Sequence, residues 1–345
     1  MTILLKRLLQ IINLKNGFVN INEVESNLIN GRRWKKKNYT ENEINIGFQI
    51  DQKYILRCMI TLASIMDSQK SSTFIRFHFG VVLNFRVEDM IKIYSLRRII
   101  RDDVEFNFYN ASKVENDLEG LNSKGPGAVA KLLLPQLLSD DIDRLLIFDT
   151  GDLLVIKDLY EAYNWNITDY LYAGVPGRKI GQYAKISKKI WKVYISVGSF
   201  LINVKNVKKE NMYEKFVMYK NEYNSSIGDQ DLLNDVAYGK ITFLPFKFGM
   251  QSPFNSDKEG EIAKKDNIFS VYFKVINSVN NYDFLPKSEE DFMKMGYSPS
   301  VIHHCYSKWM HGGGLTIHRR LAQYYIKYAR IWDEVCRKYP GYCKI

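Results

Sequence analysis

The chain has 345 residues, of which 46% are hydrophobic and 25% are charged, and its formal net charge at pH 7 is +11. This length and balance exclude a disordered chain and indicate a globular protein, built as one large α/β domain or as one domain with a smaller appendage. Its four cysteines are too few for a disulfide framework, although pairing of Cys336 with Cys343 stays open.

The excess of basic residues is a property that nucleic-acid-binding proteins share. The basic residues are scattered, with local runs only at 32–37, 185–192 and 205–209. No helix-turn-helix pattern, paired-cysteine zinc spacing or aromatic RNA-binding motif accompanies them. We therefore expect no nucleic acid partner and favour a protein that handles a phosphorylated small molecule. The nucleic-acid-binding alternative would require a continuous basic stripe.

The first residues, TILLKRLLQIINL, mix apolar and basic side chains. Lys6 and Arg7 interrupt the apolar run, so it is too short and too charged to span a bilayer and makes a poor signal peptide. It is expected to be an amphipathic helix on the protein body or on a membrane surface. We expect no transmembrane segment and a soluble, cytoplasmic protein; the secretory lumen (Golgi or endoplasmic reticulum) stays open if an anchor has been removed.

The first half of the chain alternates between strand and helix patterns. Residues 1–43 are expected to be an N-terminal extension that ends in a linker, and the folded body begins at Ile44. The pattern then predicts strands at 44–48, 73–83 and 104–108 and helices at 55–66 and 86–98. This alternation is typical of an α/β protein with a parallel sheet. Asp51 follows the first strand, and doubly wound folds bind nucleotides at such strand ends.

Two carboxylates lie between two apolar runs in the stretch IDRLLIFDTGDLLVIKDL. The run at 145–148 has the pattern of a strand buried on both faces, and a second apolar run follows at 153–156. Asp149 and Asp152 lie between the two runs, where Gly151 permits a sharp turn. Mg²⁺ and Mn²⁺ bind carboxylate oxygens, so the pair predicts a metal site, although a solvated acidic turn is the simpler alternative.

A basic residue lies in the segment before these carboxylates. Residues 128–138, AVAKLLLPQLL, predict a helix with a kink at Pro135. Lys131 interrupts its apolar surface. It is either a surface residue that extends its ammonium into water, or it reaches the edge that carries Asp149 and Asp152 and holds a phosphate.

The second half of the chain continues the alternation and adds a histidine cluster. We expect a helix at 158–163, a strand at 170–175, a small-residue turn that leads into a buried strand within 194–203, a helix opened by 228–231, and a strand at 241–246. Asp229 and Gln230 open that helix, where acidic residues can simply be caps. His303 lies in a short strand that ends in a polar turn with Lys308, and a single histidine is more often structural than a ligand.

Five of these stretches resemble, in the same order over about residues 44–312, the family 8 glycosyltransferases. They are INIGFQIDQKYILRCMITLASIM, AVAKLLLPQLLSDDIDRLLIFDTGDLLVIKDL, ISVGSFLINV, GDQDLLND and VIHHCYSKW. The resemblance implies an α/β domain of GT-A type that binds a nucleotide sugar over residues 44–318, with a mostly parallel central sheet flanked by helices. A C-terminal helical extension would follow over residues 319–345.

The resemblance also implies an activity. It predicts a metal-dependent, retaining hexosyl- or pentosyltransferase that moves a sugar from a UDP-sugar to an acceptor hydroxyl of a glycan, lipid or protein, with Mn²⁺ or Mg²⁺ as cofactor. The residues implied are Asp149, Asp152 and His303 for the metal, Asp51 and Tyr54 for uridine, Lys131 and Lys308 for the phosphates, and Asp229 and Gln230 for the donor sugar at the catalytic centre. Gln230 is given only a positioning role near the reacting carbon.

The sequence departs from the family pattern at three points. The family's Asp-x-Asp motif is replaced by DTGD at 149–152, so Thr150 takes the place of the first Asp if Asp152 keeps its own. Ser196 stands where the family usually has Asn, and Lys308 precedes Trp309 without a proline between them. The alternative function is therefore an inactive pseudoenzyme that binds a nucleotide sugar or a glycan on the same fold.

Overall fold

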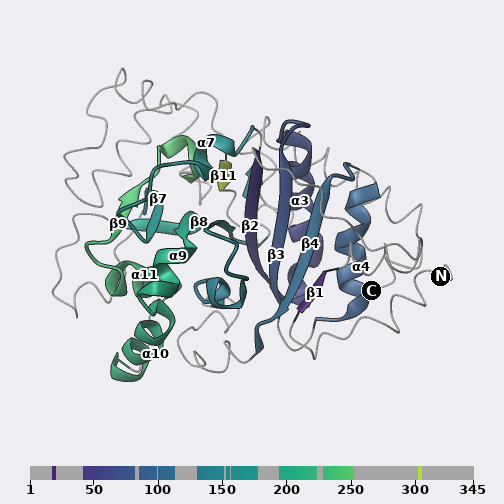
Figure 1. Cartoon of the computed structure of the whole chain (residues 1–345). Helices are drawn as coiled ribbons and strands as arrows, with labels where there is room; N and C mark the ends of the chain where they lie inside the picture. Colours follow the sequence, from purple (N-terminus) through teal and green to yellow (C-terminus); the bar gives the residue numbers. More distant parts are fainter. Residues whose placement is uncertain are drawn as a thin grey trace, which may run out of the picture.

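The computed structural model describes residues 18–20, 42–81, 85–98, 100–112, 130–150, 153–155, 157–177, 194–223, 228–251 and 302–304. Within these residues, a mixed sheet has the strand order β1-β4-β3-β2-β5-β8-β7-β9, and a smaller sheet has the order β10-β11-β6 (Figure 1). The strands of the large sheet are β1 (Phe18–Asn20), β2 (Glu43–Ile50), β3 (Phe74–Val81), β4 (Val104–Asn110), β5 (Arg144–Phe148), β7 (Tyr172–Pro176), β8 (Ile195–Asn203) and β9 (Ile241–Phe243). Those of the small sheet are β6 (Leu153–Val155), β10 (Met250–Gln251) and β11 (Ile302–His304).

The centre of the large sheet is parallel, as the sequence predicts. Strands β4, β3, β2 and β5 run parallel to one another, whereas β8 is antiparallel to both β5 and β7. The carboxyl ends of β2 and β5 therefore meet beside a strand that begins at the same edge. In α/β proteins, the crevice at such a reversal is the usual place for a ligand.

The helices form layers on this sheet. They are α3 (Ile55–Ser68), α4 (Val87–Ser95), α7 (Tyr160–Tyr163), α9 (Val204–Lys209), α10 (Met212–Tyr223) and α11 (Asp229–Val236), with short 3₁₀ turns η2 (Gln52–Tyr54), η3 (Leu96–Arg98), η4 (Leu134–Leu137) and η5 (Phe246–Phe248). None of the helices in the described ranges is long and apolar enough to cross a membrane.

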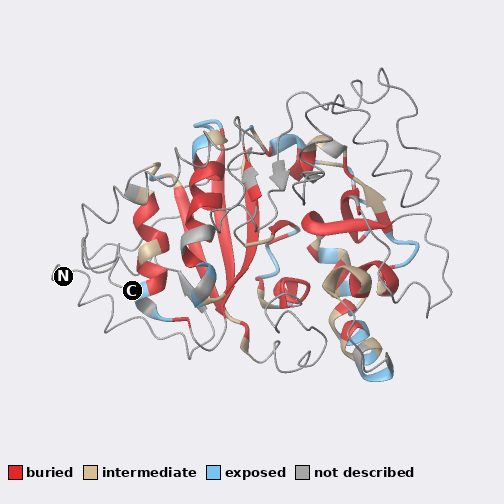
Figure 2. Ribbon diagram, turned by 180° about the vertical axis from the view of Figure 1, so that it is seen from behind, coloured by how far each residue is buried: buried red, intermediate tan, exposed pale blue. Residues whose placement is uncertain are grey.

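One face of β2, β3 and β4 packs against α3 and α4 (Figures 1 and 2). Alternate residues of β2 point to this face, and Ile44, Ile46 and Phe48 are fully buried there. The Phe79 and Phe108 rings of the neighbouring strands stack with their centroids 4.8 Å apart. Burial of these side chains is the main stabilising contribution to this half of the fold.

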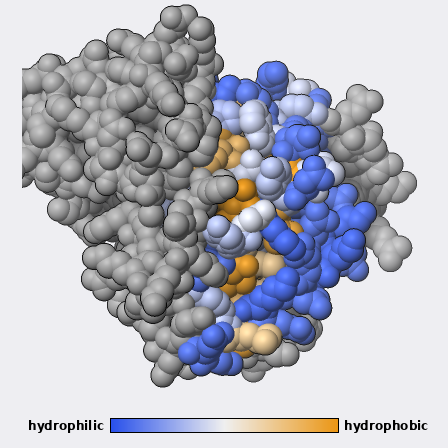
Figure 3. All heavy atoms as spheres, turned by 90° about the vertical axis from the view of Figure 1, so that its left-hand side faces the viewer, coloured by the Kyte–Doolittle hydropathy of each residue, from blue (hydrophilic) through white to orange (hydrophobic). Residues whose placement is uncertain are grey.

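A second apolar cluster holds the other half together. It joins β5, β7 and β8 to η4, α9, α10 and α11, and includes Leu133, Leu145, Phe200, Phe216 and Leu233. Seen from the side where β9, α10 and α11 lie, the described surface is mainly hydrophilic, with apolar residues gathered in a narrow strip (Figure 3). These helices therefore bury one face and expose the other.

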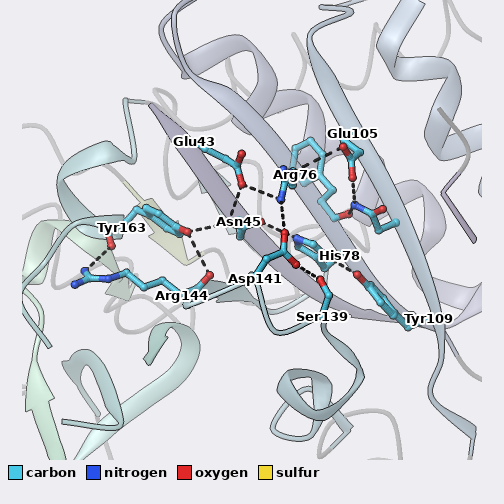
Figure 4. A network of polar contacts seen from close by, with 12 residues as sticks. Glu43, Asn45, Arg76, His78, Glu105, Tyr109, Ser139, Asp141, Arg144 and Tyr163 are labelled. Atoms are coloured by element: carbon cyan, nitrogen blue, oxygen red, sulfur yellow. Dashed lines mark hydrogen bonds and ion pairs between the residues drawn. The ribbon is translucent and has the colours of Figure 1, made fainter. Parts of the chain in front are cut away.

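A buried polar network covers the opposite face of β2, β3 and β4 (Figure 4). The two ring nitrogens of His78 lie 3.0 Å from the Tyr109 hydroxyl and 2.9 Å from the Asn45 amide oxygen. Asn45 donates to the Tyr163 hydroxyl at 2.9 Å. Burial is the main cause that lowers the pKa of His78 to about 3, so its imidazole is neutral and acts as a structural hydrogen-bonding group.

Arg76 is the cation at the centre of this network. Its guanidinium lies 3.0 Å from Glu43, 3.7 Å from Asp141 and 3.9 Å from Glu105 (Figure 4). Because Glu43 is the first residue of β2, this ionic cluster lies at the amino ends of the parallel strands. It joins the sheet to the loop before β5, at the edge opposite to the one that positions Asp149.

Residues 130–138 differ from the helix that the sequence predicts. Leu133 and Gln136 donate to the carbonyls three residues earlier, at 3.0 Å each, so the segment is a turn followed by the 3₁₀ turn η4. Pro135 explains the error, because it has no N–H group and disfavours the α conformation of the residue before it. The expected residues 128 and 129 lie outside the described residues.

Four further elements differ from the sequence-based expectation. Strand β1, within the expected N-terminal extension, pairs antiparallel with β4 and so belongs to the sheet. Helices α9 and α10 follow β8 without having been predicted. The expected turn at the start of 194–203 is instead a continuous strand, β8. The proposed domain boundaries stay a prediction.

Candidate functional site

The turn after β5 is attached to both neighbouring strands. The N–H group of Asp149 donates to the Gly198 carbonyl of β8 at 2.8 Å. The Thr150 hydroxyl donates to the Gln49 carbonyl near the end of β2. These bonds fix the first carboxylate of the predicted metal site at the carboxyl edge of the sheet. They also turn the Thr150 hydroxyl toward the sheet.

Lys131 lies behind this turn as a buried cation. Its ammonium is ion-paired with Asp149, lies 2.7 Å from the Asp229 carboxylate, and donates to the Val197 carbonyl at 2.9 Å. Only 4% of the Lys131 side chain is exposed, so the alternative of a lysine that extends into solvent is wrong. Burial lowers the pKa of Lys131, but attraction to Asp149 and Asp229 outweighs it and raises the pKa above its ordinary value.

Asp229 reaches this cluster from the first turn of α11. Gly228 is the N-cap of that helix, and Asp229 is its first residue. Its carboxylate is 20% exposed and contacts Lys131. The structure thus brings together three residues that the sequence singled out, Lys131, Asp149 and Asp229. Two carboxylates and one ammonium leave the cluster with a net negative charge.

Gln230 is held in place by a tyrosine that the sequence did not single out. The Gln230 amide nitrogen donates to the Tyr194 hydroxyl at 3.2 Å, and that hydroxyl donates to Asp231 at 2.6 Å. The Tyr194 side chain is only 1% exposed. Its position directly before the small-residue stretch ISVGS is the signal that could have identified it.

Asn234 attaches α11 to β8. Its amide oxygen accepts from the Ile195 N–H at 2.8 Å, and its amide nitrogen donates to the Ile195 carbonyl at 2.9 Å. Asn234 is fully buried, and its position directly after two leucines of the helix sequence LLND is the signal that could have identified it. These bonds give Asp229 and Gln230 a rigid support, because they fix the next turn of their helix.

The predicted uridine-binding residues lie at the end of β2. Asp51 follows the strand, and its carbonyl accepts from the Tyr54 N–H at 3.2 Å. Tyr54 is 40% exposed, which leaves its ring accessible to a ligand. The Thr150 to Gln49 bond shows that this strand end adjoins the acidic turn. Asp51 and Tyr54 therefore lie on the same edge of the sheet as Asp149.

The backbone also brings the predicted histidine ligand toward the acidic turn. Strand β11 pairs antiparallel with β6, with His303 opposite Leu154 and His304 opposite Leu153. Leu153 directly follows Asp152 in the chain. The side chain of His303, and the whole of Asp152 and Lys308, lie outside the described residues.

A metal ion fits the chemistry of these donors. Two carboxylates and one imidazole suit Mn²⁺, and the pairing of β6 with β11 brings their chain segments to one place. Among the side chains that the structure describes, no group of three or more His, Cys, Asp or Glu residues is arranged to hold a metal ion. Of the three predicted ligands, only Asp149 has a described side chain.

Comparison with known proteins places these features in a family. The model of glycosyl transferase family 8 matches residues 45–305. A Haemophilus influenzae protein with a provisional description as a glycosyltransferase is 25% identical over 249 residues, which are 68% of this chain and 70% of that protein.

Solved structures of glycosyltransferases have a similar fold. The galactosyltransferase LgtC, in complex with donor and acceptor sugar analogs, has a TM-score of 0.60 at 16% identity, over 83% of this chain and 95% of that one. The apo form of mouse xyloside xylosyltransferase 1 has a TM-score of 0.50 at 12% identity, over 76% of this chain and 98% of that one. At these identities the likeness concerns the fold.

Proposed function

The chain belongs to glycosyltransferase family 8, and we propose that it transfers a sugar from a UDP-sugar to an acceptor hydroxyl, with retention of configuration and with the help of a divalent metal ion. Its fold is of GT-A type, and it is an enzyme of the glycosyltransferase class. The single observation that carries the proposal is the cluster of Lys131, Asp149 and Asp229 at the carboxyl edge of the sheet.

The proposed metal ligands are Asp149, Asp152 and His303. An ion bound there supplies positive charge that offsets the charge of the leaving diphosphate. The bond from the Asp149 N–H group to the Gly198 carbonyl fixes the backbone that carries this carboxylate. Lys308 is proposed to contact the same phosphates.

The nucleotide is proposed to bind at the end of β2. The Asp51 carboxylate would accept hydrogen bonds from uridine, and the exposed ring of Tyr54 would contact it through its apolar face. Because Asp51 and Asp149 follow adjacent parallel strands, a nucleoside bound to Asp51 would lie beside the proposed metal position.

The donor sugar is proposed to contact the start of α11. Asp229 would accept hydrogen bonds from sugar hydroxyls, and Gln230, oriented by Tyr194, would position the reacting carbon. Lys131 directs its N–H groups to Asp149, Asp229 and Val197, so it would act on the donor mainly by holding the two carboxylates. The acceptor hydroxyl would attack from the face that the diphosphate leaves.

Two observations favour the alternative of a non-catalytic sugar-nucleotide-binding protein. Thr150, which takes the place of an Asp when the motif is aligned on Asp152, donates its hydroxyl to the sheet, and Asp149 already has Lys131 as its cation. If both features persist when ligands bind, the metal site would have one carboxylate fewer.

Incubation of the protein with a panel of UDP-sugars, with and without Mn²⁺, distinguishes the two functions. Transferase activity predicts that one UDP-sugar releases UDP in a manganese-dependent reaction, and that an acceptor accelerates the release. Binding of a UDP-sugar without UDP release, in the presence of both Mn²⁺ and acceptor glycans, would instead identify a pseudoenzyme.

A further inference from the structure

The ammonium group of Lys131 contacts Asp149, which is a proposed metal ligand. An ammonium group has three N–H donors, and three acceptors surround this one: Asp149, Asp229 and the Val197 carbonyl. Each acceptor comes from a different element, since Asp149 follows β5, Asp229 opens α11 and Val197 lies in β8. The lysine therefore connects the carboxylate proposed for the metal with the carboxylate proposed for the sugar.

The cation and the carboxylates differ in their exposure. The Lys131 side chain is 4% exposed, whereas 31% of Asp149 and 20% of Asp229 are exposed. The lysine is thus more deeply buried than the two carboxylates that it contacts. A buried cation in this position attracts Asp149 strongly, because the low dielectric of the interior weakens charge interactions less than water does.

We infer that Lys131 is a positioning residue that competes with the divalent ion for Asp149. The inference rests on the proposed function, because it takes Asp149 as a metal ligand. In the free protein the ammonium neutralises part of the charge that would attract the ion, so metal binding alone is weak. A bound diphosphate adds negative charge that offsets the repulsion between the ion and Lys131, so the nucleotide strengthens metal binding.

The test compares Mn²⁺ affinity of the wild type and Lys131→Met, measured from the electron paramagnetic resonance signal of free Mn²⁺. We expect Lys131→Met to bind Mn²⁺ without nucleotide about tenfold more tightly than the wild type, because Asp149 and Asp229 lose their cation. UDP should strengthen Mn²⁺ binding to the wild type more than to the variant. An equal or weaker Mn²⁺ affinity of Lys131→Met would overturn the inference.

A matched control is available elsewhere in the chain. Lys208 also contacts one carboxylate, Asp140 at 2.8 Å, and donates to one carbonyl, Leu138 at 2.7 Å. Lys208→Met should leave Mn²⁺ affinity unchanged, because Asp140 is not a proposed ligand. If Lys208→Met also bound Mn²⁺ about tenfold more tightly, the change in affinity would reflect only the loss of one positive charge. This result would overturn the specific role of Lys131.

A second pair of variants guards against misfolding of Lys131→Met. The double variant Lys131→Met with Asp229→Asn keeps the net charge that the cluster has in the wild type. It is compared with Asp229→Asn alone. We expect the double variant to bind Mn²⁺ more tightly. If the wild type binds no Mn²⁺ even with UDP, the proposed metal dependence fails and this inference fails with it. If the wild type binds Mn²⁺ and the removal of Lys131 changes nothing, only the inference fails.

Discussion

His303 lies opposite Leu154 in the antiparallel pair formed by β11 and β6. Strand β6 is the first element after the acidic turn, so the pairing brings the histidine segment of the C-terminal third beside the turn that carries Asp149 and Asp152. The paired backbones of adjacent strands lie about 5 Å apart, a distance that side chains bridge easily. The assignment of Asp149, Asp152 and His303 as metal ligands requires their chain segments to lie this close together.

The first prediction concerns the metal ligands. Asp152→Asn should abolish turnover and leave the free energy of unfolding unchanged, because an amide replaces a charged oxygen ligand with a group of the same shape. His303→Ala should raise the dissociation constant of Mn²⁺ by at least about tenfold. Manganese-dependent UDP release measures the turnover of Asp152→Asn, and urea denaturation measures its free energy of unfolding. Mn²⁺ titration in the presence of UDP measures the dissociation constant for His303→Ala.

The neighbouring histidine is the matched control for His303. His304→Ala should change Mn²⁺ affinity little, because successive residues of a strand face opposite sides. Equal losses in both histidine variants would indicate a damaged strand rather than a lost ligand. Unchanged turnover of Asp152→Asn would refute the metal assignment.

Much of the fold around the candidate site follows from local sequence patterns. Strands β2 to β5 were predictable, because runs of alternating or continuous apolar residues are bounded by turn residues, and the carboxyl ends of parallel strands meet at one edge. For the same reason, the proximity of Asp51 and Asp149 could be inferred before the structure. One of the two alternatives for Lys131 was that it reaches the edge that carries Asp149 and holds a phosphate; the structure places it at that edge, and the phosphate contact stays a prediction.

The remaining features depend on contacts between distant parts of the chain. Asp229 had an equally good local explanation as an acidic residue of the first helical turn, and its contact with Lys131 could not be inferred from the local pattern. Tyr194 looks like a core residue in sequence, and its bond to Gln230 needs α11 to lie against β8. The 3₁₀ turn at η4 shows the limit of apolar spacing, because one proline overrode a helical pattern.

The second prediction concerns Asp229. Asp229→Asn should lower kcat/KM for the UDP-sugar by about 10- to 100-fold, since hydrogen bonds to a charged group are lost both to the sugar and to Lys131. UDP itself, which lacks the sugar, should bind with unchanged affinity when its binding is measured without metal. Asp231→Asn is the control, because its amide oxygen can still accept from Tyr194 and its side chain has no proposed contact with the donor. Loss of UDP binding in Asp229→Asn would contradict the assignment to the sugar.

The third prediction concerns Tyr194. Tyr194→Phe removes the hydroxyl that accepts from Gln230, so kcat should fall about tenfold through poorer orientation, with the dissociation constant of UDP unchanged. Tyr172→Phe is the matched control: Tyr172 is also buried, and its hydroxyl has no hydrogen-bond partner within the described structure. Equal losses of kcat in the two variants would show that Tyr194 acts only through core packing.

The fourth prediction concerns the pH dependence of stability at His78. Burial, with a smaller contribution from Arg76, lowers the pKa of this imidazole to about 3, whereas the unfolded chain has the ordinary value of 6.5. Between these pH values the unfolded state binds the proton, so the contribution of His78 to stability is complete above pH 6.5 and is lost as the pH falls. Relative to His78→Gln, the wild type should lose up to about 1.4 kcal/mol of unfolding free energy per pH unit below 6.5. Urea denaturation at several pH values measures this difference, and a constant difference would contradict a neutral His78.

The fifth prediction concerns Glu43, where stability should fall, and not rise, as the pH increases. Burial, together with the carboxylates of Glu105 and Asp141, raises the pKa of Glu43 from 4.5 to about 7, against the hydrogen bond from Asn45. The Arg76 guanidinium, 3.0 Å from Glu43, also contacts Asp141 and Glu105. The folded state therefore holds the extra proton between pH 4.5 and 7, and the wild type should lose stability relative to Glu43→Gln as the pH rises through this range. If the difference instead grows in favour of the wild type, the ion pair with Arg76 dominates and Glu43 is ionised throughout.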